Sequence, residues 1–228
     1  MNYNNVIAIT NRKICYQSLC NRPESEWHRN TCLTPETLAR LTEQISMDEQ
    51  NACRALLSQM ARLSQTNLIQ IVLREKDLSK ADYMLLAKAA IEICNYYNKK
   101  LILHNYIEVT EELKYPHIQL PLHIMKSAKE NNYSLTHYQT IGVSVHSTEE
   151  AILAEKLGAT YLSAGHVFDT ECKKGLPGRG LSFLQDICTS VSIPVYAIGG
   201  INQNNIPMVM ESGARGGCMM SGLMKIRL

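Results

Sequence analysis

We predict an α/β protein, a (β/α)8 barrel of the TIM type. Eight short runs of apolar or β-branched residues recur along the chain, and amphipathic helical patterns separate several of them. Apolar strands that alternate with helices are typical of a parallel sheet covered on both faces. The length of 228 residues and the 45% hydrophobic content suit one large domain over 1–228.

The predicted strands, in order, are 6–10, 68–73, 100–104, 117–120, 140–145, 160–165, 194–199 and 216–220. The clearest helical patterns cover 79–98 and 147–158. In the second of these, Ser147 with Glu150 forms an N-terminal capping box, and Gly158 ends the helix. In such a barrel the active site is expected at the carboxyl ends of the strands.

Two regions depart from a regular barrel. Residues 11–48 contain a polar, loop-like N-terminal insertion, with a helix expected from about Thr34. After the last strand only SGLMKIRL (221–228) follows, so the final helix is expected to be short or missing. This would expose one flank of the barrel, which the insertion or a second subunit in a homo-oligomer would cover.

Composition limits the partners and the compartment. A formal net charge of +2 with 19% charged residues gives no basic stripe, so no nucleic-acid partner is expected. No run reaches the roughly 20 apolar residues of a membrane span, and the N-terminal residues lack a secretory signal. The eight cysteines include no CxxC pair. We therefore expect a cytoplasmic protein with reduced thiols, without membrane association and without a metal site.

Two small-residue pairs are candidate phosphate ligands. Gly199 and Gly200 follow the seventh predicted strand, and Ser221 and Gly222 follow the eighth. Backbone N–H groups in such positions bind phosphate in many barrels, particularly where a helix begins nearby, and Asn202 or a neighbour is expected to cap that helix. The alternative is that the glycines only permit a tight turn.

Arg74 and Lys76 are candidate ligands for an anionic group, because both follow the second predicted strand. The alternative is a solvated loop in which Glu75 and Asp77 neutralise their neighbours. Asn105, after the third strand, is expected to bind a ligand or to form a turn.

Several candidates lie at other strand ends. His104 is expected to be a core residue or to support a neighbouring residue that contacts the ligand. Ser144 and His146, at the end of the fifth strand, share one face by their alternation. His166 directly follows Gly165 at the end of the sixth strand, where an imidazole is either a packing residue or a proton-transfer group.

Taken in order, these stretches resemble the thiamine phosphate synthase superfamily from about Leu68 to Met224. The matching pieces are REKD, LILHN, GVSVHS, AEKLGATYLSAGHVF, IPVYAIGGI and SGL. The superfamily contains Mg²⁺-dependent synthases, which join an aminopyrimidine pyrophosphate to a thiazole phosphate. It also contains a TenI-type branch of thiazole tautomerases, whose members have been called regulators as well.

The motifs favour the TenI-type branch. Val72 stands where synthases have glutamine, and Tyr106 stands where they have a metal-binding aspartate. The synthase histidine-glycine motif and its later aspartate are replaced by QLPLH (119–123), so both metal carboxylates are missing. GHVF followed by Thr170 and then CKKGL is the form seen in tautomerases, with His166 at the catalytic position.

The resemblance implies a metal-free isomerisation. His166 would move a proton on a phosphorylated thiazole carboxylate, because histidine's typical pKa of about 6.5 suits acid–base work at neutral pH. Gly199, Gly200, Ser221 and Gly222 would hold the phosphate. One of the cations Arg74, Lys76 and Lys173 would meet the carboxylate, while Asn105, Ser144 and Thr170 would line the pocket. No cofactor is expected.

Three alternatives stay open. The first is an active synthase, in which case Mg²⁺ would be required. The second is a regulatory protein that keeps the barrel and the phosphate pocket without catalysis. The third is another metal-free isomerase that acts on a small phosphorylated ligand.

Overall fold

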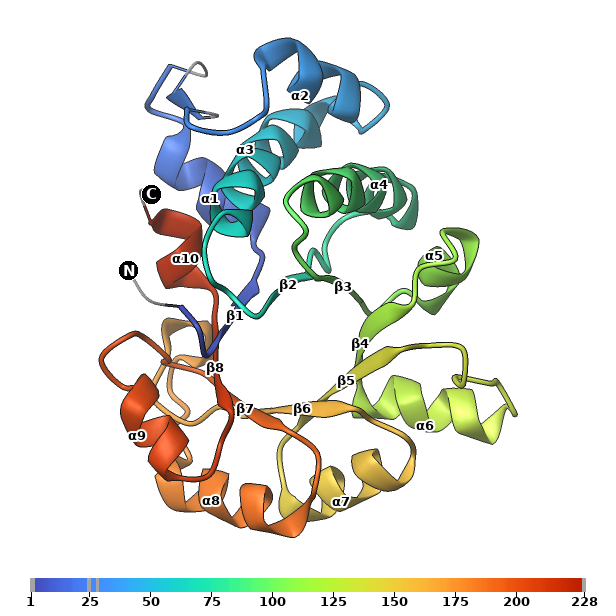
Figure 1. The fold of residues 1–228 in the computed structure, drawn as a ribbon, viewed down its shortest axis with the longest axis vertical. Helices are drawn as coiled ribbons and strands as arrows, with labels where there is room; N and C mark the ends of the chain where they lie inside the picture. The colour runs from blue at the N-terminus through green and yellow to red at the C-terminus, as the bar shows by residue number, and fades with distance from the viewer. Residues whose placement is uncertain (1–2, 24–25, 28, 227–228) are drawn as a thin grey trace. The chain divides into compact units, whose positions relative to one another are not determined.

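A computed structural model describes residues 3–23, 26–27 and 29–226. Eight strands are hydrogen-bonded in sequence order and close into a barrel, with helices between them (Figure 1). The strand pairs with a defined register are parallel, as at Val143–Leu162 and Ala197–Gly217. The predicted (β/α)8 barrel is therefore confirmed.

The strands fall within two residues of the predicted runs, and almost all of their residues are buried. They are β1 Val6–Ile9, β2 Gln70–Leu73, β3 Leu101–His104, β4 His117–Pro121, β5 Thr140–Val145, β6 Tyr161–Gly165, β7 Val195–Ile198 and β8 Gly216–Met219. Runs such as Val6–Ile9 succeed as predictors because a strand buried on both faces needs apolar residues at every position.

Four of the described α-helices follow a residue whose side chain caps them, namely Asn11, Thr34, Ser79 and Ser147. The described helices are α1 Arg12–Leu19, α2 Pro35–Thr42, α3 Met47–Ser64, α4 Lys80–Tyr96, α5 Ile107–Glu112, α6 Leu122–Glu130, α7 Thr148–Lys156, α8 Gly180–Ser190, α9 Ile206–Glu211 and α10 Ser221–Lys225, with a 3-10 turn η2 Glu171–Lys173. The Ser147 hydroxyl accepts from the Glu150 N–H at 3.2 Å. The Glu150 carboxylate accepts from the His146 N–H instead of from Ser147, so only half of the predicted capping box forms.

The predicted loop character of residues 11–48 is wrong at its start. α1 follows β1 directly, because the Asn11 side chain accepts from the Ile14 N–H at 3.1 Å and caps the helix. Arg12, Cys15 and Leu19 form its buried face. The helix expected from about Thr34 is confirmed as α2, which Thr34 caps. Residues 24–25 and 28 of the insertion lie outside the described residues.

The final helix is short, as one of the two predicted outcomes. α10 has five residues and packs against α1. The Gln59 side chain of α3 donates to the carbonyls of Leu223 at 2.7 Å and Ile226 at 3.1 Å. α3 therefore anchors the last helix through its backbone.

The chain divides into two compact units, which we describe separately. Unit 1 comprises 1–4, 8–113 and 220–228, and unit 2 comprises 5–7 and 114–219. That 1–228 forms a single domain stays a prediction. All eight cysteines are unpaired. Within the described ranges, no helix combines the length and apolar character needed to cross a membrane.

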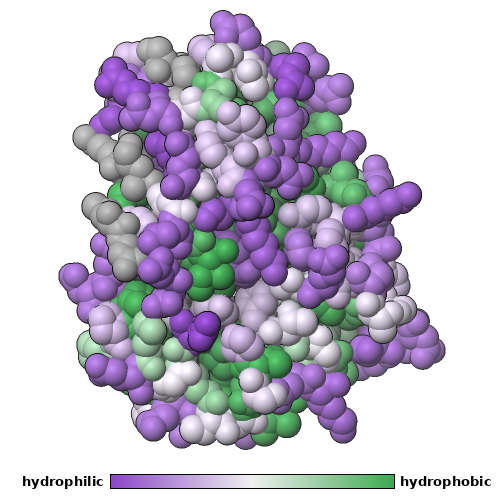
Figure 2. Space-filling view, in the orientation of Figure 1, coloured by the Kyte–Doolittle hydropathy of each residue, from purple (hydrophilic) through white to green (hydrophobic). Residues whose placement is uncertain are grey.

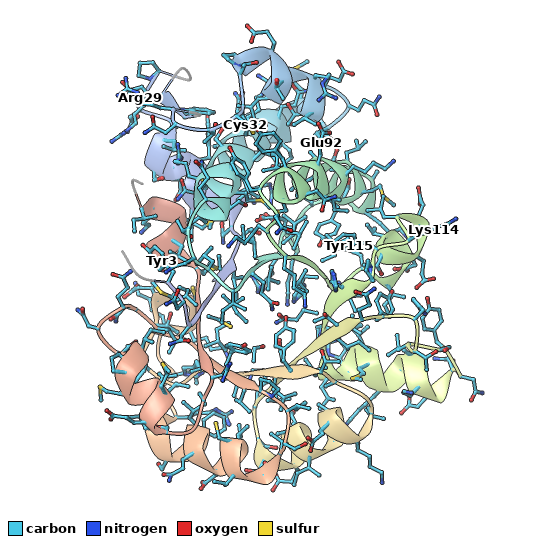
Figure 3. The ribbon with its side chains drawn as sticks, viewed as in Figure 1. Tyr3, Arg29, Cys32, Glu92, Lys114 and Tyr115 are labelled. Atoms are coloured by element: carbon cyan, nitrogen blue, oxygen red, sulfur yellow. The ribbon has the colours of Figure 1, made fainter. Side chains whose placement is uncertain are left out.

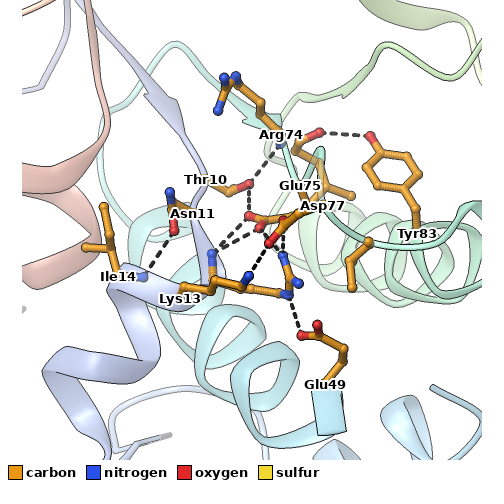
Figure 4. A network of polar contacts seen from close by, with 12 residues as sticks. Thr10, Asn11, Lys13, Ile14, Glu49, Arg74, Glu75, Asp77 and Tyr83 are labelled. Atoms are coloured by element: carbon orange, nitrogen blue, oxygen red, sulfur yellow. Dashed lines mark hydrogen bonds and ion pairs between the residues drawn. The ribbon is translucent and has the colours of Figure 1, made fainter. Parts of the chain in front are cut away.

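A buried guanidinium organises the strand ends of unit 1 (Figure 4). The Arg12 side chain is 0% exposed and bonds Glu75 at 3.1 Å, Asp77 at 2.6 Å and Glu49 at 2.8 Å. Glu75, 3% exposed, also accepts from the Thr10 hydroxyl at 2.6 Å and from the Arg12 N–H. Arg12 and its neighbour Lys13 hold the pKa of Asp77 well below its usual range. The cluster thereby ties the start of α1 to the end of β2.

Replacing Arg12 with methionine should lower the free energy of unfolding by about 3–5 kcal/mol, because Glu75 would stay buried without its partner. The matched control is Arg40→Met, which breaks the exposed pair with Glu92 and should cost at most about 1 kcal/mol. Urea denaturation of both variants measures the difference. Equal losses in the two variants would contradict the organising role of Arg12.

Candidate active site

His166 lies at the end of β6, the strand on which the sequence analysis placed it. The whole of β6 is buried, and His166 itself is only 7% exposed. The peptide bond between Gly165 and His166 is cis. Backbone bonds from Val167 to the Ile198 carbonyl (2.9 Å) and from Phe168 to the Gly199 carbonyl (3.1 Å) continue the pairing with β7 beyond the strand. The loop after β6 is thus held against the loop after β7.

Glycines on either side of the contact make this close approach possible. A Cβ on Gly165 would lie 2.3 Å from the Ile198 carbonyl oxygen, and one on Gly199 would lie 2.3 Å from the Cβ of His166. Gly199 also has a φ of +96°, a conformation that favours glycine. The glycine before His166 and the glycine after β7 are therefore required to seat this histidine.

The imidazole of His166 makes one hydrogen bond to the described residues. Its Nε2 lies 3.3 Å from the Leu176 carbonyl, which can only accept, so Nε2 carries the hydrogen of the neutral ring. Nδ1 then holds the lone pair. Nδ1 is buried and has no hydrogen-bond partner among the described residues. A buried imidazole nitrogen with a free lone pair is suited to accept a proton.

Two further side chains hold the segment around His166. The Nδ1 of His146 lies 2.7 Å from the Gly165 carbonyl, so this nitrogen is the donor. Arg179 donates from its side chain to the His146 carbonyl and from its backbone to the His166 carbonyl. It also lies over the ring of Phe183, 5.0 Å from its centroid. His146 therefore contacts the backbone of β6 and orients it.

A polar network, which the sequence analysis missed, runs between β4, β5 and β6. The Tyr161 hydroxyl donates to Gln119 at 2.7 Å, and Gln119 donates to Ser144 at 3.3 Å and Ser163 at 3.2 Å. Ser163 bonds Ser144 at 3.1 Å, and the two serines are partners in the strand register. Gly142 leaves room for the Tyr161 ring. The signal in the sequence was the alternation of Tyr161 with Ser163 along one strand face.

The loop after β7 differs from the predicted strand–glycine–helix arrangement. Gly200 has a φ of +67°, and α9 begins only at Ile206. Its N-cap residue is Asn205, whose side chain makes no cap hydrogen bond. It instead donates to the Gly200 carbonyl at 3.0 Å and accepts from the Asn202 N–H at 2.9 Å. These contacts turn the Asn205 side chain toward the glycine loop instead of the helix.

The other predicted ligands of phosphate or carboxylate are more exposed. Thr170 accepts from the Cys172 N–H at 3.4 Å and begins the turn η2, in which Lys173 is exposed. Ser221 and Gly222 are exposed at the start of α10, in unit 1. The side chains of Lys173 and His166 are not joined by a hydrogen bond.

Arg74 and Lys76 lie just after β2. The neighbouring acids Glu75 and Asp77 form their ion pairs with other residues. The interpretation in which Glu75 and Asp77 neutralise Arg74 and Lys76 is wrong, because both carboxylates bind Arg12. Neither Arg74 nor Lys76 has a carboxylate partner among the described residues, and the Arg74 side chain extends away from the acidic cluster (Figure 4). Arg74 and Lys76 therefore stand at this end of β2 without a paired carboxylate in the described part of the chain.

The positive charges of Arg74 and Lys76 affect the neighbouring His104. It is buried at the end of β3, as predicted for a core residue, and its backbone N–H donates to the Tyr83 hydroxyl at 2.8 Å. Burial and the charges of Arg74 and Lys76 lower the pKa of His104 to about 3. Asn105 follows with a φ of +76°, so it forms the turn between β3 and α5.

The ends of β3 and β4 carry no carboxylate that could bind Mg²⁺. Magnesium prefers carboxylate oxygens. β3 is followed by Asn105 and Tyr106, whose hydroxyl donates to the Leu78 carbonyl, and β4 ends at Pro121. Among the described residues there is no group of three His, Cys, Asp or Glu side chains that could hold a metal. The residues present therefore do not fit a magnesium site of this kind.

Comparison with known proteins identifies the family. Residues 44–223 match the family described as thiamine monophosphate synthase. This chain belongs to that family.

Its relatives carry the same name. The thiamine-phosphate synthase of Fusobacterium nucleatum is 33% identical over 154 residues, which cover 68% of this chain and 74% of the relative. That of Clostridium acetobutylicum is 35% identical over 154 residues, covering 68% and 72%. A solved thiamine phosphate pyrophosphorylase from Pyrococcus furiosus has a TM-score of 0.65 at 25% identity and covers 98% of this chain and 90% of its own. The chain therefore belongs to an enzyme family of thiamine biosynthesis.

Gly199→Ala should disturb His166, whereas Gly158→Ala should not. Both glycines have positive φ, +96° and +102°, but nothing lies within 4 Å of a Cβ at Gly158. The shared backbone strain costs about 1–3 kcal/mol in either variant. The clash at Gly199 should lower the free energy of unfolding by roughly a further 1–3 kcal/mol and should shift the NMR signals of the His166 ring. Equal denaturation midpoints with unchanged His166 signals would refute the close contact.

Because His104 is buried, the free energy of unfolding should decrease as the pH is lowered. Its folded-state pKa of about 3 lies below the usual value of about 6.5, so the unfolded chain takes up the proton first. The free energy of unfolding contributed by this group should fall by about 1.4 kcal/mol per pH unit as the pH drops from about 6.5 toward 3. His104→Gln should remove that slope in urea titrations, and His123→Gln, at an exposed site, should keep it.

Proposed function

We propose that this protein is a thiazole tautomerase. It converts the non-aromatic tautomer of a phosphorylated thiazole carboxylate into the aromatic thiazole. The observation that carries the proposal is the free, buried Nδ1 of His166 beside an Nε2 held by the Leu176 carbonyl. The residues that replace the metal-binding carboxylates of synthases support it, because proton transfer does not need them.

His166 does the chemistry by moving one proton. Its Nδ1 takes the proton from the ring carbon that bears the carboxylate, and the electron pair of that C–H bond moves into the ring. The exocyclic double bond then accepts the same proton from the imidazolium, directly or through a water. The composition is unchanged, and aromaticity provides the driving force. A positioned acid–base group of this kind accelerates a reaction by roughly 10²–10⁴-fold.

The remaining candidates bind and orient the substrate. The backbone N–H groups around Gly199 and Gly200 are proposed to hold the phosphate, together with Ser221 and Gly222. Arg74 and Lys76 are the cations for the carboxylate, since neither is compensated by an acid in the described residues. Lys173 is a weaker candidate because it is exposed in η2. Asn105, Ser144 and Thr170 line the site.

The substrate must reach a nitrogen that is buried. The segment that follows His166 is fastened by the Gly178 N–H, which donates to Asp169 at 2.6 Å, and it carries Leu176, whose side chain is exposed. Substrate binding therefore requires the atoms that cover Nδ1 to move aside, and their burial of the ring keeps water from the imidazolium.

The second candidate is a thiamine-phosphate synthase. The names of the relatives favour it, including a 31% identical protein from Streptococcus pneumoniae that covers 77% of this chain. That reaction releases pyrophosphate, for which Mg²⁺ normally supplies several kcal/mol of charge stabilisation. The carboxylates that would hold the metal are replaced here, and this disfavours the synthase as the main activity.

A paired assay separates the two functions. Without added metal, the wild type should convert the non-aromatic thiazole carboxylate phosphate into the aromatic tautomer, and His166→Ala should lose roughly 10²–10⁴-fold of the rate. His123→Ala, at an exposed histidine, is the matched control and should keep it. Circular dichroism of both variants checks that they are folded.

The second arm supplies aminopyrimidine pyrophosphate, thiazole phosphate and Mg²⁺, and measures thiamine phosphate. Formation of thiamine phosphate would assign the synthase in place of the tautomerase. Substrate binding with no turnover in either arm would indicate a regulatory protein instead.

A further inference from the structure

A small cavity in unit 1 lies where three helices end. It occupies about 190 Å³ beside the last residues of α1, α3 and α10, which lie side by side (Figure 1). The charged residues of its lining are Arg22, Glu26, Arg29, Arg62 and Lys225. α3 ends at Ser64, just before β2 begins, whereas Arg74 and Lys76 follow the other end of that strand. The cavity is thus separate from the strand end at which we place the substrate.

Arg62 is the buried charge of this cavity. It is 9% exposed, and its guanidinium donates twice to the Gln59 side chain, at 3.0 and 2.6 Å, and once to the Trp27 carbonyl. None of these acceptors is a carboxylate, and no carboxylate among the described residues pairs with Arg62. Burial and the nearby charge of Arg22 lower its pKa. A buried cation without a counter-charge is costly, and an anion would relieve that cost.

The frame around Arg62 is fixed before any ligand binds. The same Gln59 side chain that accepts from Arg62 donates to the Leu223 and Ile226 carbonyls of the C-terminal segment. The indole of Trp27 donates to the Leu19 carbonyl at 3.1 Å, and its ring packs edge-on against Tyr16. These bonds orient the guanidinium, so binding does not have to order it.

The cavity carries an excess of positive charge. Arg22 is 3.8 Å from Glu26, which leaves Arg29, Arg62 and Lys225 without an acidic partner in the described residues. Arg29 belongs to the segment between α1 and α2 (Figure 3), and hydrophilic residues gather over that end of unit 1 (Figure 2). Three helix C-termini contribute roughly half a negative charge each. They offset about half of the three cations, so a net positive potential remains.

We propose that this cavity binds a phosphate group, as inorganic phosphate or as a small phosphomonoester. Arginine guanidinium groups match phosphate oxygens in pairs, and Arg62 faces the cavity from a fixed position. The volume of about 190 Å³ is below the roughly 300 Å³ at which pockets for drug-sized ligands begin. It therefore suits a phosphate and not a nucleotide. This site is independent of the proposed tautomerase reaction.

Trp27 provides a specific reporter, because it is the single tryptophan of the chain and its carbonyl accepts from Arg62. The indole N–H resonance of the ¹⁵N-labelled full chain is followed while inorganic phosphate or glycerol phosphate is added at constant ionic strength. A saturable shift is expected with at least one of them, and none with acetate. Response to inorganic phosphate only would identify the free ion, and a tighter response to glycerol phosphate would identify a phosphomonoester.

Variants test whether the cations are responsible. The double variant Arg29→Gln/Lys225→Gln should bind phosphate at least about tenfold more weakly, since it loses two charge-assisted contacts. The control Arg40→Gln/Lys80→Gln removes two exposed cations of the same unit that do not line the cavity, and it should bind like the wild type. Arg62→Met should abolish the shift, and the double variant decides the question if Arg62→Met does not fold.

Three results would overturn the proposal. The first is that the Trp27 resonance shows no saturable shift below about 0.1 M phosphate, above which screening weakens such contacts. The others are an equal shift with acetate and an unchanged phosphate affinity in the Arg29→Gln/Lys225→Gln variant. His166→Ala should keep the shift. A failure of phosphate binding would leave the isomerase assay unaffected, and a silent isomerase assay would leave the Trp27 titration unaffected.

Discussion

The buried guanidinium of Arg12 is the interaction on which the candidate site of unit 1 depends. It forms ion pairs with Glu75, Asp77 and Glu49, and these pairs hold the start of α1 beside the end of β2. Because the acids of the REKD stretch are taken up by Arg12, its two cations are left uncompensated. The same ion cluster therefore stabilises the fold and leaves Arg74 and Lys76 without a paired carboxylate among the residues that the structure describes.

In unit 2 the corresponding constraint is steric. β6 and β7 continue to pair beyond their ends, and this is possible because glycines occupy the positions where a Cβ would collide with Ile198 or His166. The ring of His166 is then held by one carbonyl, with its second nitrogen unpaired. In the proposed reaction this placement orients the imidazole before the substrate binds.

Family membership and local chemistry answer different questions. Membership assigns the chain to thiamine biosynthesis, and the relatives are named as synthases. The activity depends on the side chains at the strand ends, because one fold supports several reactions. Here those side chains retain a histidine and cations but replace the carboxylates that a magnesium-dependent reaction uses. That difference in side chains is the reason for preferring an isomerase.

The sequence by itself determined the strands, the barrel and the position of His166, because continuous apolar runs and glycine-bounded strand ends are local signals. It also indicated Arg74 and Lys76 as cations at a strand end. It did not determine their electrostatic state, because the partner of Glu75 is Arg12, 63 residues earlier in the chain. The network from Tyr161 through Gln119 to Ser144 was missed for the same reason, since its hydrogen bonds join residues 19 to 44 positions apart. The start of α1 was taken for a loop because its few buried positions include a charged one, Arg12. Only the tertiary structure decided these contacts, because burial and pairing between distant segments are not encoded in any local pattern.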